Sequence, residues 1–254
     1  MDFVSLRLIR LRELEMILSH FPPRGRVLEL GAGAGYQAKD LAQRGYVVTA
    51  LDVAGSVYES ERVFRVEEYD GRHIPYSDGY FDVVFSSNLL EHIHDPRLLL
   101  AETRRVLRRD GRAIHVVPTS TWRLWSLIAY YPYVIRAAIL LLRDKNIAVK
   151  ADADRPKRSW TAYLRALWPP RHGETGTAII ELVTYSRWRW RRLMRKSGFA
   201  IRSEQPLRLF YTGAHLLGTR LSISTRESLS RAFGSACRVF VLQPRTLPPD
   251  LGNR

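Results

Sequence analysis

A short apolar run followed by three glycines at alternate positions is the feature that most constrains how this chain folds. Residues 26–30 lead directly into Gly31, and Gly33 and Gly35 follow before a helical stretch that begins near Tyr36. Glycines in this position allow a tight turn between a strand and a helix, and they let a ligand lie against bare backbone. The segment therefore predicts a strand–turn–helix unit with a ligand site at the turn.

The spacing of the glycines and the next carboxylate narrows the kind of ligand. A nicotinamide dinucleotide site would have glycine at the sixth position counted from Gly31, where this chain has Tyr36. Asp52 ends the second apolar run about twenty residues after the first glycine, where a carboxylate can accept hydrogen bonds from both ribose hydroxyls. The glycines and Asp52 together predict a nucleoside-binding site of GxGxG type.

Apolar runs separated by helical stretches continue along the chain in a βαβ rhythm. A helix from about Pro96 to Leu107 is expected to end at Asp110-Gly111, and another is expected to begin at Ser186 and end at Ser197-Gly198. The fold class predicted is α/β, a Rossmann-like, doubly wound, mostly parallel seven-stranded sheet with helices on both faces. The expected strands are residues 26–30, 46–51, 63–66, 81–86, 113–117, 199–203 and 238–242.

Turn-forming residues and local composition divide the chain into five parts. These are an N-terminal amphipathic helix (1–23), a cofactor-binding half (24–118), a helical, aromatic-rich insertion after the fifth strand that caps the substrate (119–180), a segment that completes the sheet (181–247) and a loose tail (248–254). Hydrophobic residues make up 46% of the chain and charged residues 26%, which permits an ordinary packed core. The single cysteine, Cys237, excludes an internal disulfide, and no Cys/His cluster has zinc spacing; both suit a reducing cytoplasm and predict no metal.

Several motifs in residues 24–118 resemble class I S-adenosylmethionine-dependent methyltransferases, particularly the small-molecule group that includes the ubiquinone and menaquinone methyltransferases. The resemblance implies a Rossmann-like fold, S-adenosylmethionine as the cofactor and methyl transfer as the activity. It rests on Val-Leu-Glu-Leu-Gly-Ala-Gly-Ala-Gly at 27–35, Asp52, Tyr-Asp-Gly at 69–71, Ile-Pro-Tyr at 74–76, Phe-Asp-Val-Val-Phe-Ser-Ser-Asn-Leu-Leu-Glu-His at 81–92, and residues 99–117.

The same resemblance assigns candidate cofactor contacts. The turn would lie against the methionine part of the cofactor, Asp52 and the following Val53 would serve the ribose, and Asp70 and Gly71 would face the adenine. The full set is Glu29, Gly31, Ala32, Gly33, Asp52, Val53, Asp70, Gly71, Asn88 and Leu89. Methyl transfer itself needs mainly positioning and a dry pocket, and a hydroxyl acceptor would gain from a general base. The candidate bases are His92, His172 and His215, because histidine titrates near neutrality. Glu174 and Tyr211 are comparable candidates from the same two segments as His172 and His215.

The later half of the chain suggests a surface partner. Residues 122–143 are apolar and aromatic, but Arg136 and Pro132 interrupt them, so an amphipathic helix at a bilayer surface fits better than a membrane span. Residues 187–196 are strongly basic, and the formal net charge of the chain is +15. We therefore expect a cytoplasmic enzyme, peripheral at the inner face of an anionic membrane, acting on a small-molecule or lipid-linked acceptor such as a quinone-like ring or a saccharide.

Two other functions compete with this prediction. The charge also suits a nucleic-acid methyltransferase, but residues 87–90 are Ser-Asn-Leu-Leu rather than the Asp/Asn/Ser-Pro-Pro-aromatic motif common in base-amine methylation. A cofactor-binding protein without turnover is the third possibility, because a fold and a bound cofactor do not guarantee catalysis.

Overall fold

Seven strands form one sheet in the order β3-β2-β1-β4-β5-β7-β6. The computed structural model describes residues 3–143, 168–212 and 221–245. β7 is antiparallel to both of its neighbours and the other six strands share one direction, which confirms the predicted mostly parallel α/β sheet. The strands are β1 (Arg26–Leu30), β2 (Val47–Val53), β3 (Glu67–Tyr69), β4 (Phe81–Ser87), β5 (Leu107–Pro118), β6 (Phe199–Pro206) and β7 (Cys237–Pro244).

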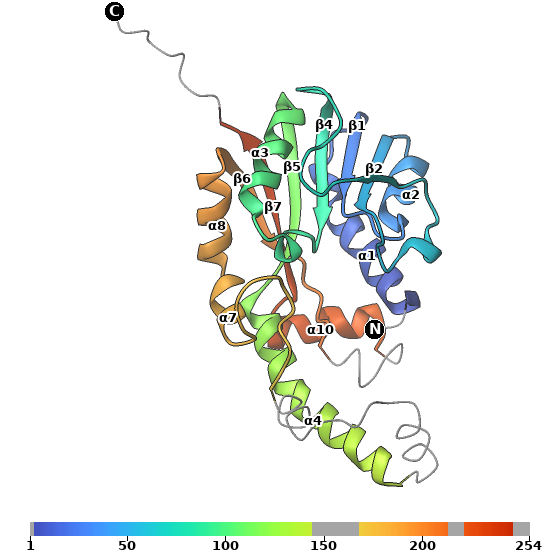
Figure 1. Cartoon of the computed structure of the whole chain (residues 1–254), viewed down its shortest axis with the longest axis vertical. Coiled ribbons are helices and arrows are strands. Elements are labelled where there is room, and N and C mark those ends of the chain that lie inside the picture. Colours follow the sequence, from blue (N-terminus) through green and yellow to red (C-terminus); the bar gives the residue numbers. More distant parts are fainter. Residues whose placement is uncertain (1–2, 144–167, 213–220, 246–254) are drawn as a thin grey trace, which may run out of the picture.

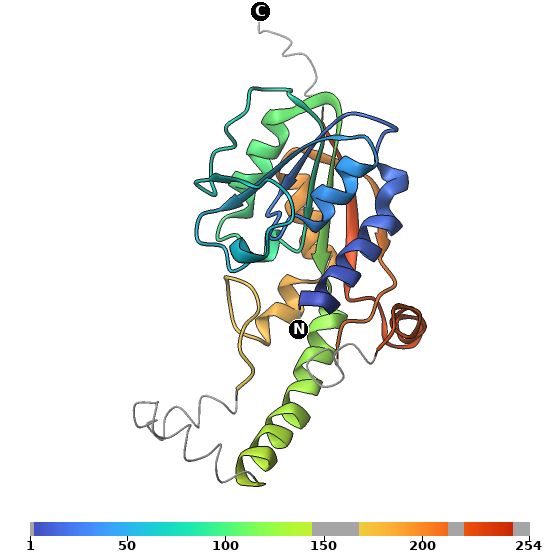
Figure 2. The ribbon, with the colours of Figure 1, turned by 90° about the vertical axis from the view of Figure 1, so that its right-hand side faces the viewer.

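Helices cover both faces of this sheet (Figures 1 and 2). α1 (Phe3–Ile17) and α2 (Tyr36–Gln43) lie on one face, and α3 (Pro96–Val106) and α8 (Arg187–Lys196) lie on the other. α10 (Ile223–Phe233) lies beside α1, and α7 (Ile180–Thr184) precedes α8. Short 3₁₀ turns occupy Leu18–His20, Glu59–Glu61 and Leu90–His92.

Side chains of the strands pack into two hydrophobic cores, one on each face of the sheet. In β4, Phe81 packs with α3 and α8, and the pairing with β5 shifts its register between Phe81 and Val83. After this shift, Val84 packs with α3 and α8, whereas Val83 and Phe85 pack with α1 and α2. This division follows from the pleat, since successive side chains point to opposite faces of a sheet. Both faces of the central strands are therefore buried, as their nearly continuous apolar sequence requires.

Local capping explains where two of the predicted helices begin. Asp95 accepts a hydrogen bond from the Arg97 amide at 3.0 Å, and Pro96 occupies the first position of α3. Ser186 accepts from the Arg189 amide at the start of α8, which confirms the predicted N-cap.

Two predicted boundaries are wrong. The third strand is Glu67–Tyr69 rather than 63–66, because Phe64 and Val66 instead pack beside the glycine turn against a small core of alanines. α3 ends at Val106, one residue before the predicted Leu107, but Asp110-Gly111 lies within β5 rather than at the helix end, because Leu107 is already extended, is buried, and pairs with β4. β5 therefore begins well before the predicted residue 113.

α4 (Ser120–Arg143) starts directly after β5 and extends away from the sheet (Figures 1 and 2). In the described ranges no helix combines the length and apolarity needed to cross a bilayer. The middle of the predicted insertion, His215 and the tail from residue 248 lie outside the described residues.

Candidate active site

A cavity of about 820 Å³ opens at the carboxyl ends of β1, β2 and β4. Open α/β sheets bind their ligands at this edge. Its walls come from α1, the glycine turn, the ends of β2 and β4, α4, and two later loops. The lining residues are Leu6, Ile9, Arg10, Gly31, Gly33, Asp52, Ser56, Val57, Tyr58, Asn88, Leu89, His92, Trp122, Arg123, Ser126, Ala129, Tyr130, Pro169, Pro170, Arg171, His172, Tyr211, Thr212 and Cys237.

The glycine turn has a backbone conformation that side chains would disturb. Gly31 has φ +68° and Gly33 has φ +55°, both in the left-handed region. A Cβ on Gly31 would lie 2.7 Å from Cδ1 of Leu89, and one on Gly33 would lie 3.2 Å from Cδ2 of Tyr58. The amides of Gly31 and Ala32 donate to the Leu51 carbonyl at 2.8 and 3.1 Å. The turn is thus fixed against β2 and leaves bare backbone facing the cavity.

Asp52 holds the glycine turn and also faces the cavity. One of its oxygens accepts from the Gly33 amide at 2.9 Å and from the Ser56 hydroxyl at 3.2 Å, and the other accepts from the Val53 amide at 2.8 Å. A carboxylate has about four lone-pair sites, so three such bonds leave room for a ligand hydroxyl. Asp52 therefore positions the turn and can still bind a ribose.

Glu29 lies under the turn on β1 and is almost completely buried. Burial raises the pKa of this carboxyl to about 8, and one of its oxygens has no hydrogen-bond partner. The protonated form is therefore favoured at neutral pH. Neither Glu29 nor Ala32 lines the cavity, so both support the cradle from behind.

The raised pKa of Glu29 predicts a pH-dependent stability. The folded protein keeps this proton up to about pH 8, whereas an unfolded glutamate loses it near pH 4.5. Folding stability is then greatest in acid and falls as pH rises between these values, by about 1.4 kcal/mol per pH unit. We expect the stability of the wild type relative to Glu29→Gln to fall from pH 5 to pH 9 in denaturant titrations. A difference that does not change with pH would contradict the assignment.

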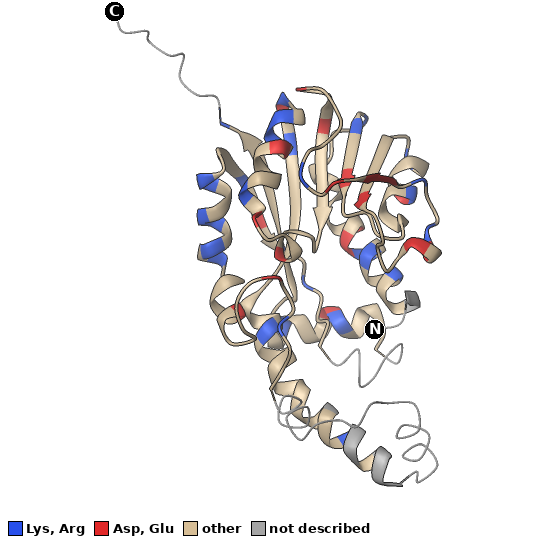
Figure 3. Ribbon diagram, viewed as in Figure 1, with Lys and Arg blue, Asp and Glu red and all other residues tan. Residues whose placement is uncertain are grey.

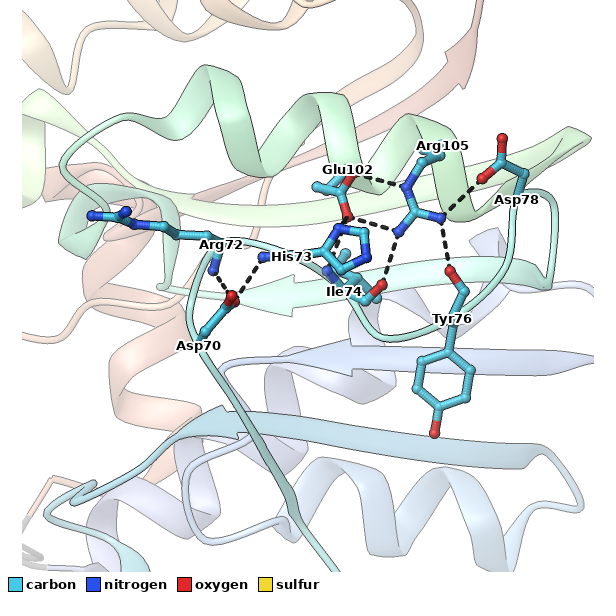
Figure 4. Close-up of polar contacts among 8 residues, drawn as sticks. All are labelled: Asp70, Arg72, His73, Ile74, Tyr76, Asp78, Glu102 and Arg105. Atoms are coloured by element: carbon cyan, nitrogen blue, oxygen red, sulfur yellow. Dashed lines mark hydrogen bonds and ion pairs between the residues drawn. The ribbon is translucent and has the colours of Figure 1, made fainter.

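The loop carrying Asp70 and Gly71 is tied to α3 (Figure 4). Its anchor is Arg105, which binds Glu102 through two bonds of 2.7 and 2.8 Å. The amides of residues 72 and 73 donate to Asp70 and lower the pKa of its carboxyl. The predicted residues Asp70, Gly71 and Val53 do not line the cavity. Gly71 lies next to Val53, because a Cβ on Gly71 would be 3.2 Å from Cγ1 of Val53. Arg105 also contacts the carbonyls of Ile74 and Tyr76 and the carboxylate of Asp78.

Asn88 and Leu89 form the end of the cavity that lies above β4. Asn88 has φ +52°, an uncommon conformation for a residue other than glycine, and its amide donates to the Val116 carbonyl at 2.9 Å. The thiol of Cys237 donates to the Asn88 side-chain oxygen at 3.2 Å. Leu89 lies over Gly31. Both predicted residues therefore face the cavity beside the glycine turn.

Two of the three predicted bases meet in the cavity. The rings of His92 and His172 lie edge to face with centroids 4.8 Å apart, and the ring centroids of Trp122 and His172 are 4.7 Å apart. Burial lowers the pKa of both histidines, to about 4 for His172. Both rings are therefore neutral near pH 7 and able to accept a proton.

A buried ion pair fixes the loop that carries His172. Glu181 of α7 accepts from the amides of His172 and Gly173, each at 2.7 Å, and its second oxygen lies 2.7 Å from the guanidinium of Arg123. Both charged side chains are at most 6% exposed. Glu181 thus joins α4, α7 and the His172 loop into one unit.

Glu91 adds an unsatisfied acid beside the histidines. It is buried, neither of its oxygens has a hydrogen-bond partner, and burial raises the pKa of its carboxyl to about 8. One ligand atom from each of Glu91, His92 and His172 lies within 4.8 Å of the others, a spacing that could hold a metal ion. The sequence alone does not reveal this cluster, because His172 is distant in sequence from Glu91 and His92.

Three cavity or near-cavity residues, Arg10, Glu13 and Cys237, were missed by sequence reasoning, whereas Tyr211 was a predicted candidate. Arg10 of α1 binds Glu13 at 2.6 Å and donates to the Ser87 hydroxyl at 3.3 Å. Tyr211 also donates to Glu13, and Cys237 lies beside Asn88. Arg10, Tyr211 and Cys237 line the cavity, so α1 places a guanidinium next to the end of β4. No local motif marks these residues, because they meet only through the tertiary fold.

Comparison with known proteins finds methyltransferases similar to the first half of the chain. A family model described as a methyltransferase domain matches residues 28–115. A ubiquinone biosynthesis O-methyltransferase of Pasteurella multocida is 25% identical over 41% of this chain and 50% of its own length. A malonyl-[acyl-carrier protein] O-methyltransferase of Geobacter sulfurreducens is 32% identical over 43% of this chain and 46% of its own. Residues 28–115 thus match a methyltransferase domain, which supports the resemblance of this part of the chain to class I S-adenosylmethionine-dependent methyltransferases.

A solved structure extends the likeness of fold to the rest of this methyltransferase. A SAM-dependent methyltransferase from Aquifex aeolicus covers 96% of the chain, and all of that structure is matched, with a TM-score of 0.52 and 16% identity. The chain spans about half the length of the curated relatives that it matches. S-adenosylmethionine is the cofactor of the family, as the sequence predicted.

The cavity fits this cofactor on its own geometry. The glycine turn is a cradle that any Cβ would fill, and Asp52 keeps acceptor capacity for ribose hydroxyls. Arg10 supplies a cation near the turn, where a carboxylate can bind. The volume of about 820 Å³ lies within the range of roughly 300 to 1,000 Å³ usual for cofactor sites.

Proposed function

We propose that this methyltransferase transfers the methyl group of S-adenosylmethionine to a small or amphiphilic acceptor at the surface of an anionic membrane. One observation carries the proposal: the glycine turn and Asp52 share a single cavity with His92, His172 and the first turns of α4. The cavity can therefore hold the cofactor at the glycine turn and an acceptor beside the two histidines.

The residues around the cavity have separable roles in this reaction. When bound, S-adenosylmethionine supplies a methyl group on a positively charged sulfur, which leaves as a neutral thioether. Asp52 holds the ribose, and Arg10 pairs with the methionine carboxylate. Neutral His92 or His172 accepts the proton that an acceptor hydroxyl loses as its oxygen bonds to the methyl carbon. Trp122 and Leu89 exclude water from this space.

Calorimetry followed by product detection tests the proposed activity. S-adenosylhomocysteine is titrated into the protein, and methylated products are then sought by mass spectrometry with quinone-like, saccharide and lipid-linked acceptors. Binding and transfer support the proposal. Binding without transfer to any acceptor would instead favour a cofactor-binding protein without turnover, and no binding would remove the proposal altogether.

The surface of α4 supports the membrane part of the proposal. One side of the helix lines the cavity through Trp122, Ser126 and Tyr130. Five apolar residues of α4 that do not line the cavity are about half exposed, and they are spaced three or four residues apart, as on one side of a helix. They are Leu124, Ile128, Tyr131, Ile135 and Ile139. A helix that lies in the bilayer surface would bring an amphiphilic acceptor to the cavity entrance.

Cosedimentation with phosphatidylglycerol vesicles tests this surface. We expect binding at low salt that weakens at high salt, and a loss of at least about fivefold in Ile128→Asp/Ile135→Asp because two apolar anchors are removed. Val47→Asp is the control, since Val47 is also exposed but lies at the opposite edge of the sheet. Equal binding by all three proteins, or preference for RNA over vesicles in a parallel assay, would contradict the membrane proposal.

A further inference from the structure

A second hollow, of about 390 Å³, lies between the start of α3 and the length of α8. We call it the α3–α8 groove and define it by its four cationic lining residues, Arg97, Arg189, Arg192 and Lys196. Figure 3 shows Lys and Arg positions, coloured blue, repeated along the ribbon of α8. Thr175 and Thr184 add hydroxyls, and the Thr184 hydroxyl is buried without a hydrogen-bond partner.

The four cations of the groove differ from the other arginines nearby. Glu204 of β6 lies within ion-pair distance of Arg187, Arg191 and Arg238, and so neutralises one side of α8. Across residues 3–143, 168–212 and 221–245, no ion pair with an acidic residue involves any of the four groove cations. Arg192 lies over the Trp188 ring, 5.4 Å from its centroid. No carboxylate of the described residues therefore neutralises these four cations, which leaves their charge available to an anionic ligand.

Little negative charge opposes these cations inside the groove. Asp95 also lines it, but its carboxylate caps α3 by accepting from the Arg97 amide. Glu91 also lines the groove, but this residue is only 6% exposed. The groove is thus positively charged and offers guanidinium, ammonium and hydroxyl donors, a combination suited to phosphate oxygens.

Only a thin wall separates the groove from the large cavity. Glu91 and Gly173 line the groove, whereas their chain neighbours His92 and His172 line the cavity. The wall is tightly packed, because a Cβ on Gly173 would lie 2.5 Å from the Glu91 carbonyl oxygen. A ligand in the groove therefore lies next to the two candidate bases.

We propose that the α3–α8 groove binds the phosphoryl group, a monophosphate or a diphosphate, of the acceptor. The inference rests on the proposed function and adds a substrate class to it: an acceptor that is itself a phosphate ester or is linked to a lipid through phosphate. The phosphate is held by Arg97, Arg189, Arg192 and Lys196, and the rest of the acceptor passes around the wall of Glu91 and Gly173 to reach His92 in the cavity.

Calorimetry with inorganic pyrophosphate tests the groove directly. We expect the wild type to bind pyrophosphate and the variant Arg189→Gln/Arg192→Gln to bind at least about tenfold more weakly, because charge-assisted hydrogen bonds are lost. The control is Arg109→Gln/Arg195→Gln, which removes two exposed arginines that are outside the groove. The control and the groove variant therefore have the same net charge. The control should bind within about twofold of the wild type.

Parallel measurements separate the possible outcomes. Equal losses in both variants, or no pyrophosphate binding by the wild type, would overturn the inference. Binding of phosphatidylglycerol vesicles without binding of pyrophosphate would also overturn it, because the cations would then serve a lipid surface. Titration with S-adenosylhomocysteine should be unchanged in both variants, and its failure in the wild type would count against the proposed function rather than against the groove. Thermal unfolding of each variant confirms that it folds.

Discussion

Gly31→Val is expected to lower the affinity for S-adenosylhomocysteine at least about 100-fold. Valine at φ +68° adopts a strained left-handed conformation, which costs about 1 to 2 kcal/mol. Its Cβ would also lie 2.7 Å from Leu89, and its branches would project into the space that the cofactor needs. About 2.8 kcal/mol corresponds to a hundredfold change, so strain and steric exclusion together account for the effect.

A control variant at Gly45 distinguishes the effect of backbone strain from steric exclusion of the cofactor. Gly45 has φ +92°, but nothing lies within 4 Å of a Cβ placed there, and it is outside the cavity. Gly45→Val should lower the melting temperature without changing the affinity measured by calorimetry. If Gly31→Val binds within about threefold of the wild type, the cofactor does not lie against this turn.

The half of the chain that holds the cofactor was predictable because its signals are local. A strand, a glycine turn and a helix follow one another between residues 26 and 43, and Asp52 ends the next strand. Parallel strands place their carboxyl ends at one edge of a sheet, so Asn88 and Leu89 could be assigned to the same site. The order of elements thus determined most of the cavity floor.

The cavity walls were not predictable, because they depend on contacts between distant segments. Arg10 reaches the cavity only because α1 packs across the sheet, and Tyr211 and Cys237 come from the last part of the chain. The antiparallel β7 lies between β5 and β6, an arrangement that apolar runs alone do not reveal. The predicted start of β5 was wrong for a related reason: Leu107 pairs with Phe81, so the strand begins before the local turn signal at Asp110-Gly111.

The acceptor side of the cavity depends on one buried charge pair, so its disruption should have the largest effect on stability. Glu181→Ala leaves Arg123 buried without its anionic partner and removes the acceptor for two amides of the His172 loop. Breaking a buried pair in this way costs about 3 to 5 kcal/mol. We expect the melting temperature to fall by about 10 °C in calorimetric scans.

Two further variants show whether the unpaired charge causes this loss. Arg123→Met/Glu181→Leu removes both charges and should be less destabilising than Glu181→Ala, because no charge then remains buried alone. Glu15→Ala breaks an exposed pair with Arg12 and should change stability by less than about 1 kcal/mol. S-adenosylhomocysteine should still bind folded Glu181→Ala, since Glu181 contacts none of the glycine turn, whereas methyl transfer should fall as His172 loses its anchor. If the double variant is as unstable as Glu181→Ala, packing rather than charge pairing holds α4, α7 and the His172 loop together.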